Sequence, residues 1–383
     1  MMFKFDSDKV NIQNNLLDWF AIHGRHWIPW KLKSDGNLPL HSEIISPYKI
    51  WIAEVMLQQT QLKVVIPYWQ KWMRSFPDLL ELTAADEEEL LLHWQGLGYY
   101  SRVKRIHLTS KLLLDLIGKD NYLDSSFWPV HLKQWMDFPG IGRSTGGSII
   151  SSAFDLPVAI LDGNVKRILS RLQAIDTPLS KDQKKLWELS SLLISNDHPR
   201  NFNQALMDLG SMVCTPKKPS CSSCPLQMFC VAYIKYDPED FPKKEMKKIN
   251  SFEDIGIGIV FNQDGELLIA KRLENSNMGG MWEFPGGKKK FDENITKTIE
   301  REINEEIGIE VNIGEKLVSF DHSYTHKRLS FTVHICEWRS GEPKALASQK
   351  ILWVAPERLF EFPFPAANAK IISELQKYLD ISN

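Results

Sequence analysis

The sequence predicts a multi-domain protein in which an all-α domain is followed by a smaller α+β domain. Its 383 residues are enough for two or three domains. Segments such as NNLLDWFAIHG, LKVVIPYWQKWMRSFP and KLWELSSLLISN, within residues 10–235, space apolar residues as a helix does. Later, β-type runs such as IGIGIVF, ELLIAKR, KLVSFDH and RLSFTVHICEW surround one helical segment at residues 293–307. The lysine-rich residues 236–253 between these regions are predicted to be a linker.

Composition places the chain among soluble globular proteins, with 43% hydrophobic and 25% charged residues. The apolar runs fall well short of the about 18 residues of a membrane span, and the first residues lack a signal-peptide pattern. A cytoplasmic monomer without a membrane partner is therefore expected. The formal net charge of −2 does not argue against nucleic-acid binding, because a local basic face suffices.

Four of the five cysteines lie within seventeen residues, CTPKKPSCSSCPLQMFC. The spacing is C-x6-C-x2-C-x5-C, formed by Cys214, Cys221, Cys224 and Cys230. Four thiolates on one loop can hold a [4Fe–4S] cluster or one Zn²⁺. A zinc ribbon usually has two C-x2-C pairs and this loop has one. Together with the motifs described next, this favours an iron–sulfur cluster. Cys336 stands alone in an apolar strand and is predicted to lie in the core.

A glycine-rich turn, MDFPGIGRSTGGSII, precedes a predicted helix. Gly140 and Gly142 permit close backbone approach, the helix N-terminus presents amides, and Arg143 adds charge. This is the helix–hairpin–helix pattern of sequence-independent DNA binding, although an ordinary interhelical turn can look the same.

Two carboxylates flank this turn in the sequence. Glu54 lies in the apolar segment IWIAEVML, where desolvation favours the neutral carboxyl group and makes it a candidate proton donor. Asp162 follows an apolar run and precedes a helix, which predicts an N-cap. The uncharged Gln58, Gln59 and Thr60 that follow Glu54 suit insertion into an opened base stack.

Several segments together resemble the MutY adenine DNA glycosylases over nearly the whole of the first 235 residues. They are WIAEVMLQQTQ, WQGLGYYSR, FPGIGRST, ILDGNVKR, FNQALMDLG and the four-cysteine loop. The resemblance implies a helix–hairpin–helix glycosylase domain over residues 1–213 and a [4Fe–4S] loop over 214–235. It also implies base excision repair, with removal of adenine mispaired with 8-oxoguanine or guanine in double-stranded DNA.

The resemblance assigns roles to individual residues. Glu54 matches the catalytic acid and Asp162 the group that stabilises the transition state. Gln58 and Tyr99 match residues that enter the DNA stack. Ser144 occupies the position that is Lys in lyase-competent relatives, and a serine cannot form a Schiff base with the sugar. A monofunctional glycosylase is therefore expected, and an oxidised-pyrimidine glycosylase like endonuclease III is the disfavoured alternative.

Residues 31–46, KLKSDGNLPLHSEIIS, form a longer segment than the resembled family usually has between Trp30 and Pro47. An extra surface loop is the simplest interpretation. Because the segment directly precedes that of Glu54, a contact with DNA or a partner protein is the alternative.

The C-terminal part, residues 254–383, resembles a Nudix domain. Residues 286–309 read G-x5-E-x7-R-E-I-x-E-E-x-G-I, the signature of Mg²⁺-dependent cleavage of nucleoside diphosphate linkages. Glu302, Glu305 and Glu306 fall on one side of a helix, where carboxylates can gather Mg²⁺. The chain could therefore be bifunctional and also hydrolyse 8-oxo-dGTP. A DNA-binding scaffold with inactive sites is a further alternative.

In the resembled family, this domain reads the 8-oxoguanine. Tyr324, Thr325 and His326 match the loop that contacts the oxidised base, and they keep an aromatic face and a hydroxyl group. The resemblance therefore predicts that these three residues recognise 8-oxoguanine.

Overall fold

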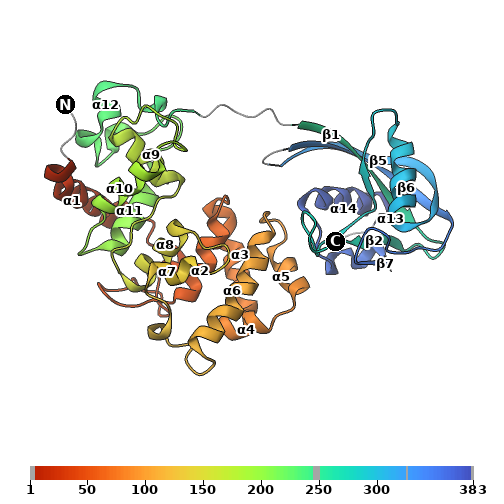
Figure 1. Ribbon diagram of the computed structural model, residues 1–383, viewed down its shortest axis with the longest axis horizontal. Coiled ribbons are helices and arrows are strands. Elements are labelled where there is room, and N and C mark those ends of the chain that lie inside the picture. The colour runs from red at the N-terminus through yellow and green to blue at the C-terminus, as the bar shows by residue number, and fades with distance from the viewer. Residues whose placement is uncertain (1–4, 245–250, 325–326, 381–383) are drawn as a thin grey trace. The chain divides into compact units, whose positions relative to one another are not determined.

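The computed structural model describes residues 5–244, 251–324 and 327–380 (Figure 1). The chain divides into two compact units. One contains Met1–Ala84 and Arg105–Lys247, and the other contains Ala85–Lys104 and Lys248–Asn383. Within the described ranges, no helix has the length and apolar character that crossing a membrane requires.

The first unit is built from helices, which confirms the all-α prediction. They are α1 (Phe5–His23), α2 (Pro47–Leu57), α3 (Leu62–Ser75), α4 (Leu79–Ala84), α7 (Leu132–Met136), α8 (Arg143–Phe154), α9 (Gly163–Leu172), α10 (Gln183–Leu193), α11 (Pro199–Met212) and α12 (Val231–Lys235). The helix α5 (Glu87–Trp94) belongs to the second unit, and α6 (Ser101–Ile117) crosses the boundary between the units.

Helices α2 and α8 supply the frame of the candidate site. Helix α2 begins at Pro47, with the Ser46 hydroxyl accepting a hydrogen bond from the Lys49 amide, and most of its residues are buried. Helix α8 is buried from Gly146 to Phe154. A second core cluster joins α1, α9, α10 and α11. Helix α8 is buried and contacts α2 and α11, and this packing holds the segment that carries Glu54. The second core cluster holds the segment that carries Asp162.

The first residues of the predicted linker pack against the helical unit. Phe241 is buried, and its carbonyl accepts a hydrogen bond of 3.1 Å from the Arg171 guanidinium. Lys243 forms a salt bridge of 3.3 Å with Asp176. The chain therefore stays attached to this unit for several residues beyond α12.

The second unit contains a mixed seven-stranded sheet, which confirms the α+β prediction. Its strands are β1 (Ser251–Phe261), β2 (Leu267–Lys271), β3 (Trp282–Glu283), β4 (Gly286–Lys288), β5 (Glu310–Tyr324), β6 (Lys327–Ser340) and β7 (Lys350–Val354). The order is β3-β2-β1-β6-β5, with β4 paired to β1 and β7 paired to β2. Only β1 and β6 are parallel among these described pairs.

Two helices cover opposite faces of this sheet. Helix α13 (Ile295–Ile307), predicted over residues 293–307, packs Ile299 and Ile303 against one face. Helix α14 (Ala366–Tyr378) packs Ile371 and Leu375 against the other. Cys336 is fully buried under α13, which confirms that it is a core residue.

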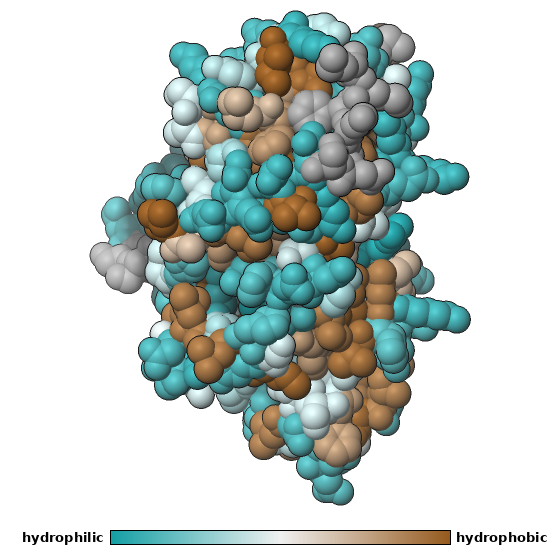
Figure 2. Space-filling model, turned by 90° about the vertical axis from the view of Figure 1, so that its left-hand side faces the viewer, coloured by the Kyte–Doolittle hydropathy of each residue, from teal (hydrophilic) through white to brown (hydrophobic). Residues whose placement is uncertain are grey.

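The surface is mixed in character. On the face shown in Figure 2, hydrophobic side chains lie among hydrophilic ones. Isolated exposed apolar side chains are normal on soluble proteins, so this distribution by itself identifies no binding surface.

Candidate active site

Glu54 lies in the middle of α2, between the buried residues Ala53 and Val55. Burial raises the pKa of its carboxyl group to about 7, and the nearby Asp162 charge acts in the same direction. Ser148 and Lys31 oppose this shift by stabilising the ionised form. A large share of Glu54 is therefore protonated near neutral pH, as expected for a general acid.

The Ser148 hydroxyl is a buried group of α8 on the Glu54 side. The residue is 3% exposed, and its Oγ has no hydrogen-bond partner within the described ranges. It is nevertheless close enough to favour the Glu54 carboxylate. A hydroxyl group that can donate to a carboxylate lowers the pKa of that acid, so Ser148 is a candidate for tuning Glu54.

Asp162 is the N-cap of α9, which confirms the sequence prediction. Its carboxylate accepts hydrogen bonds from the Val165 amide at 2.8 Å and from the Asn164 side chain at 3.1 Å. Burial raises the pKa of Asp162, and these hydrogen bonds oppose the rise. The side chain is thus held in one orientation at the positive end of a helix dipole.

A chain of hydrogen bonds connects Asp162 to the cysteine loop. Asn164, which donates to Asp162, accepts a 2.9 Å hydrogen bond from the Arg167 guanidinium. Arg167 also donates to the Cys214 carbonyl at 2.7 Å. The position of Asp162 therefore depends on the first residue of the four-cysteine loop.

The glycine-rich turn joins α7 to α8, as the helix–hairpin–helix pattern predicts. Gly140 has a φ of +81°, and a side chain there would lie 2.9 Å from Arg105. Gly142 is the N-cap of α8, and no side chain caps the amides of the first turn. These amides suit a phosphate group because they lack intrahelical partners.

Hydrogen bonds bring the hairpin, the Asp162 segment and the end of α2 together. The Ser144 hydroxyl accepts a 3.0 Å hydrogen bond from the Leu161 amide, immediately before Asp162. The Gln58 side chain donates to the Thr145 hydroxyl at 3.3 Å. Ser144 thus has a positioning contact, and Gln58 lies beside the hairpin helix.

Backbone strain marks the polar turn after α2. Gln59 is exposed and has a φ of +60°, between Gln58 and the half-buried Thr60. Positive φ at a residue other than glycine is uncommon and gathers at functional positions. Tyr99 also has a positive φ, of +50°, and is 44% exposed. Tyr99 lies in residues 85–104, which belong to the second unit.

The sequence interpretation missed a buried charge cluster beside Glu54. Asp208 of α11 is 1% exposed and forms salt bridges with Arg25 at 2.6 Å and Lys31 at 3.4 Å. Burial lowers the pKa of Lys31 to about 8, while Asp208 opposes this and Arg25 reinforces it. The one signal was Asp208 itself, the only charged residue of the segment FNQALMDLG.

The long segment 31–46 is anchored to the helical unit. The Asp155 carboxylate accepts hydrogen bonds from the Ser42 amide at 2.9 Å and lies 3.1 Å from the His41 ring. The buried Arg200 donates to the carbonyls of Leu40 and Glu43. The segment therefore has a defined course over the surface, and its role with DNA or a partner stays a prediction.

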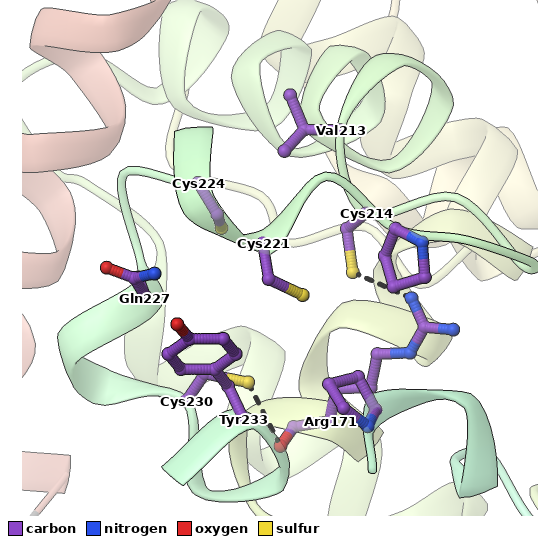
Figure 3. A pocket seen from close by; sticks show the side chains of 10 residues that line it. Arg171, Val213, Cys214, Cys221, Cys224, Gln227, Cys230 and Tyr233 are labelled. Atoms are coloured by element: carbon purple, nitrogen blue, oxygen red, sulfur yellow. Dashed lines mark hydrogen bonds between the residues drawn. The ribbon is translucent and has the colours of Figure 1, made fainter.

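The four cysteines surround one pocket, shown in Figure 3 with Arg171 and Tyr233 at its edge. The fully buried Arg171 donates to the Cys214 Sγ at 3.3 Å, and its carbonyl accepts from Cys230 at 3.5 Å. Burial raises the pKa of the Cys224 thiol to about 12. Nowhere in the described ranges do three His, Cys, Asp or Glu side chains converge as single-ion ligands. Four thiols around one pocket are a donor set that an iron–sulfur cluster or a Zn²⁺ ion can use.

The carboxylates of the C-terminal motif are organised by two glycines and one arginine. A side chain at Gly287 would collide with Glu302, and the Gly286 amide donates to Glu306 at 3.3 Å. Arg301 holds Glu302 at 2.7 Å and Glu305 at 2.9 Å. Burial, with the charge of Glu283, raises the pKa of Glu306 to about 7. The glutamates of the motif thus have defined positions. Arg301 pairs with Glu302 and Glu305 but not with Glu306.

The loop predicted to read 8-oxoguanine lies between β5 and β6. Tyr324 is the last residue of β5 and pairs with Lys327 of β6. Thr325 and His326 lie outside the described residues.

Comparisons with known proteins agree with this arrangement. Residues 52–191 match the HhH-GPD superfamily of base excision DNA repair proteins, and residues 256–374 match the NUDIX domain. An adenine DNA glycosylase of Buchnera aphidicola subsp. Schizaphis graminum is 36% identical over 322 residues, covering 84% of each chain. The human adenine DNA glycosylase is 27% identical over 424 residues, covering 98% of this chain and 76% of its own. The chain therefore belongs to the adenine DNA glycosylase family.

Proposed function

We propose that this chain excises adenine opposite 8-oxoguanine or guanine in duplex DNA, and that it does not cut the strand. Its family makes it a DNA glycosylase of base excision repair, a hydrolase that cleaves N-glycosidic bonds. One observation carries the proposed mechanism. The charge of the capped Asp162 carboxylate acts on Glu54, whose pKa is about 7, and both residues lie in the same helical unit as the glycine-rich hairpin.

The chemistry follows from these two carboxylates. Adenine lies inside the duplex and is a poor leaving group, so it has to be flipped out and protonated. The neutral Glu54 donates a proton to a ring nitrogen, and the N-glycosidic bond breaks as the sugar gains positive charge. Asp162 stabilises that charge, as the paired carboxylates of glycoside hydrolases do. Glu54, now ionised, assists the attack of water on the sugar.

The hairpin and Ser144 account for binding and for the absence of strand cleavage. The first-turn amides of α8, with Gly140, Gly142 and Arg143, are placed for a phosphate of the DNA backbone. Ser144 offers a hydroxyl already engaged by the Leu161 amide, and no amine that could attack the sugar.

Recognition of the base pair is assigned to two regions. Gln58, Gln59, Thr60 and Tyr99 are proposed to enter the base stack. Gln59 and Tyr99 have strained positive φ values, and Gln58 and Thr60 are the uncharged polar neighbours of Gln59. Tyr324, Thr325 and His326 are proposed to read 8-oxoguanine. Comparing adenine release from A:8-oxoG, A:G and A:T duplexes tests this assignment. The proposal requires the order A:8-oxoG, then A:G, then A:T, and equal rates for all three would reject it.

A [4Fe–4S] cluster is proposed to be held by Cys214, Cys221, Cys224 and Cys230, which line one pocket. When bound, the cluster would tie the loop together as a structural centre rather than take part in the reaction. The donor set fits, because all four cysteines are free thiols turned to the same pocket (Figure 3).

Replacing one ligand is expected to remove the cluster. In Cys224→Ser, the iron and sulfide content should fall from about four per chain towards zero, since three thiolates hold the cluster poorly. Chemical iron analysis and visible absorbance measure this. Cys336→Ala, in the other unit, is the matched control and should keep its iron. Full iron in Cys224→Ser would remove that residue from the ligand set.

The pH dependence of adenine release tests Glu54 and Ser148 together. Glu54 acts in its protonated form, so the rate should fall as pH rises through about 7. Ser148 favours the ionised form, so Ser148→Ala should raise the Glu54 pKa and move this fall to higher pH. Single-turnover rates between pH 5 and 9, roughly, measure the shift. Ser152→Ala, one turn later in α8, is the control. A shift to lower pH in Ser148→Ala would contradict this account.

A second activity, hydrolysis of 8-oxo-dGTP, is favoured by the assembled C-terminal motif. Glu302, Glu305 and Glu306 would hold Mg²⁺, whose preference for carboxylate oxygen they match. The bound ion would stabilise charge on the diphosphate. The fit of Gly287 to Glu302 and the separate position of Glu306 support this candidate.

The second activity has its own test. The purified full chain is expected to hydrolyse 8-oxo-dGTP with Mg²⁺, and Glu306→Gln should lower the rate by at least about 100-fold. Adenine release should stay unchanged in this variant. If the full chain shows no Mg²⁺-dependent turnover while adenine release is intact, the domain serves recognition alone.

A further inference from the structure

We infer that Trp187 of α10 is a positioning residue that holds Arg143 ready for a DNA phosphate. The inference rests on the proposed function of the hairpin. The guanidinium carbon of Arg143 lies 3.9 Å from the centre of the Trp187 ring. At that distance the planar cation stacks on the aromatic face and is attracted to it.

Arg143 depends on such a support because it begins α8 and is exposed. A free arginine side chain loses rotamer freedom when it binds, and this loss weakens binding. Stacking restricts the side chain before DNA arrives. Within the described ranges, Arg143 forms no salt bridge or hydrogen bond through its side chain. Its planar N–H donors therefore remain available for the bidentate binding that phosphate allows.

Trp187 is itself fixed. It is partly buried and packs against the core shared by α1, α9, α10 and α11. One turn later in α10, the buried Ser190 donates a 2.6 Å hydrogen bond to the Ile160 carbonyl, two residues before Asp162. Helix α10 thus supports both Arg143 and the segment that leads to the catalytic carboxylate. Phosphate capture and the position of Asp162 share one rigid element.

A double-mutant cycle on the full chain tests this inference, with the equilibrium affinity for an undamaged duplex as the readout. Arg143→Ala should weaken binding about tenfold, and Trp187→Leu, which keeps bulk but loses the aromatic face, about threefold. In the Arg143→Ala background, Trp187→Leu should add no further loss. Trp187→Phe keeps an aromatic face and should stay within about twofold of the parent affinity.

Salt dependence separates positioning from loss of charge. Arg143→Ala should reduce the slope of log affinity against log salt by about one, whereas Trp187→Leu should leave it unchanged. The inference would be overturned if the affinity losses of Arg143→Ala and Trp187→Leu were additive, or if Trp187→Leu kept the parent affinity. If Trp187→Leu proves unstable in thermal melting, Arg143→Lys decides instead. It keeps the charge without a planar face, and parent affinity there would overturn the stacking role.

These outcomes are independent of the base that is released. If the parent chain released no adenine but the cycle were non-additive, the proposed substrate would be wrong and the role of Trp187 would stand. If adenine release at saturating DNA were normal but the mutant cycle were additive, the positioning role of Trp187 would be rejected and the proposed function would stand.

Discussion

Glu54→Gln is expected to lose adenine release almost completely while the protein still binds duplex DNA. Glutamine matches the shape of protonated Glu54 but cannot deliver its proton, and general acid catalysis contributes about 10²- to 10⁴-fold. The single-turnover rate on an A:8-oxoG duplex measures the loss. The dissociation constant of the same duplex, measured by fluorescence anisotropy, should change by less than about threefold. Glutamine and the protonated Glu54 side chain are both uncharged, so the substitution does not change the charge that the DNA meets.

The control for this variant is Glu188→Gln on the exposed side of α10, where the same chemical change should leave the rate unaltered. Parent-like adenine release by Glu54→Gln would remove the residue from the catalytic step. An equal loss in both variants would indicate a general effect of charge on the helical unit rather than proton transfer.

Two substitutions of Asp162 are expected to separate its catalytic charge from its role as a helix cap. Asparagine is as good an N-cap as aspartate, so Asp162→Asn keeps the hydrogen bond that the Val165 amide now donates. It removes the negative charge that opposes the developing positive sugar, and excision should fall by at least about 100-fold. Asp162→Ala loses both functions and should also lower the free energy of unfolding by about 1 kcal/mol.

Thermal or urea unfolding measured beside single-turnover excision distinguishes these roles. The expected result is an Asn variant that is as stable as the parent chain but inactive, and an Ala variant that is less stable and inactive. An Asn variant that excises adenine at the parent rate would leave Asp162 with a structural role alone.

The sequence was most informative where one chemical requirement acts locally. Asp162 was predicted as an N-cap because an aspartate between an apolar run and a helix has few other uses, and the structure agrees. The four cysteines stand out by their spacing, and the structure places them around one pocket. The hairpin glycines are a weaker signal, because an ordinary interhelical turn can have the same spacing. Long elements such as β5, β6 and α13 were recognisable because their periodicity extends over many residues.

Contacts between distant segments were not predictable from pattern. Asp208 meets Arg25 and Lys31 across more than 170 residues, and no local rule links them. No local pattern links Trp187 of α10 to Arg143 of α8, and their contact is visible only in the structure. The two-residue β3 and three-residue β4 are too short to show any alternation, although β4 carries the glycines that contact Glu302 and Glu306.

The raised pKa of Glu54 can be predicted only in part from the sequence. Desolvation of Glu54 could be expected from its apolar neighbours in α2. The opposing contributions of Lys31 and Ser148 come from other elements, and they decide how far the shift goes. The identity of the acid could thus be predicted from the sequence, but its tuning depends on tertiary packing.

The most direct test is to identify what the full chain releases from an A:8-oxoG duplex under single-turnover conditions, and whether the strand stays intact before alkali is added. This account predicts free adenine, an abasic strand that breaks only with alkali, and neither product from the Glu54→Gln variant. Release of no adenine, or strand cleavage without alkali, would contradict a monofunctional adenine glycosylase that uses Glu54 as its acid.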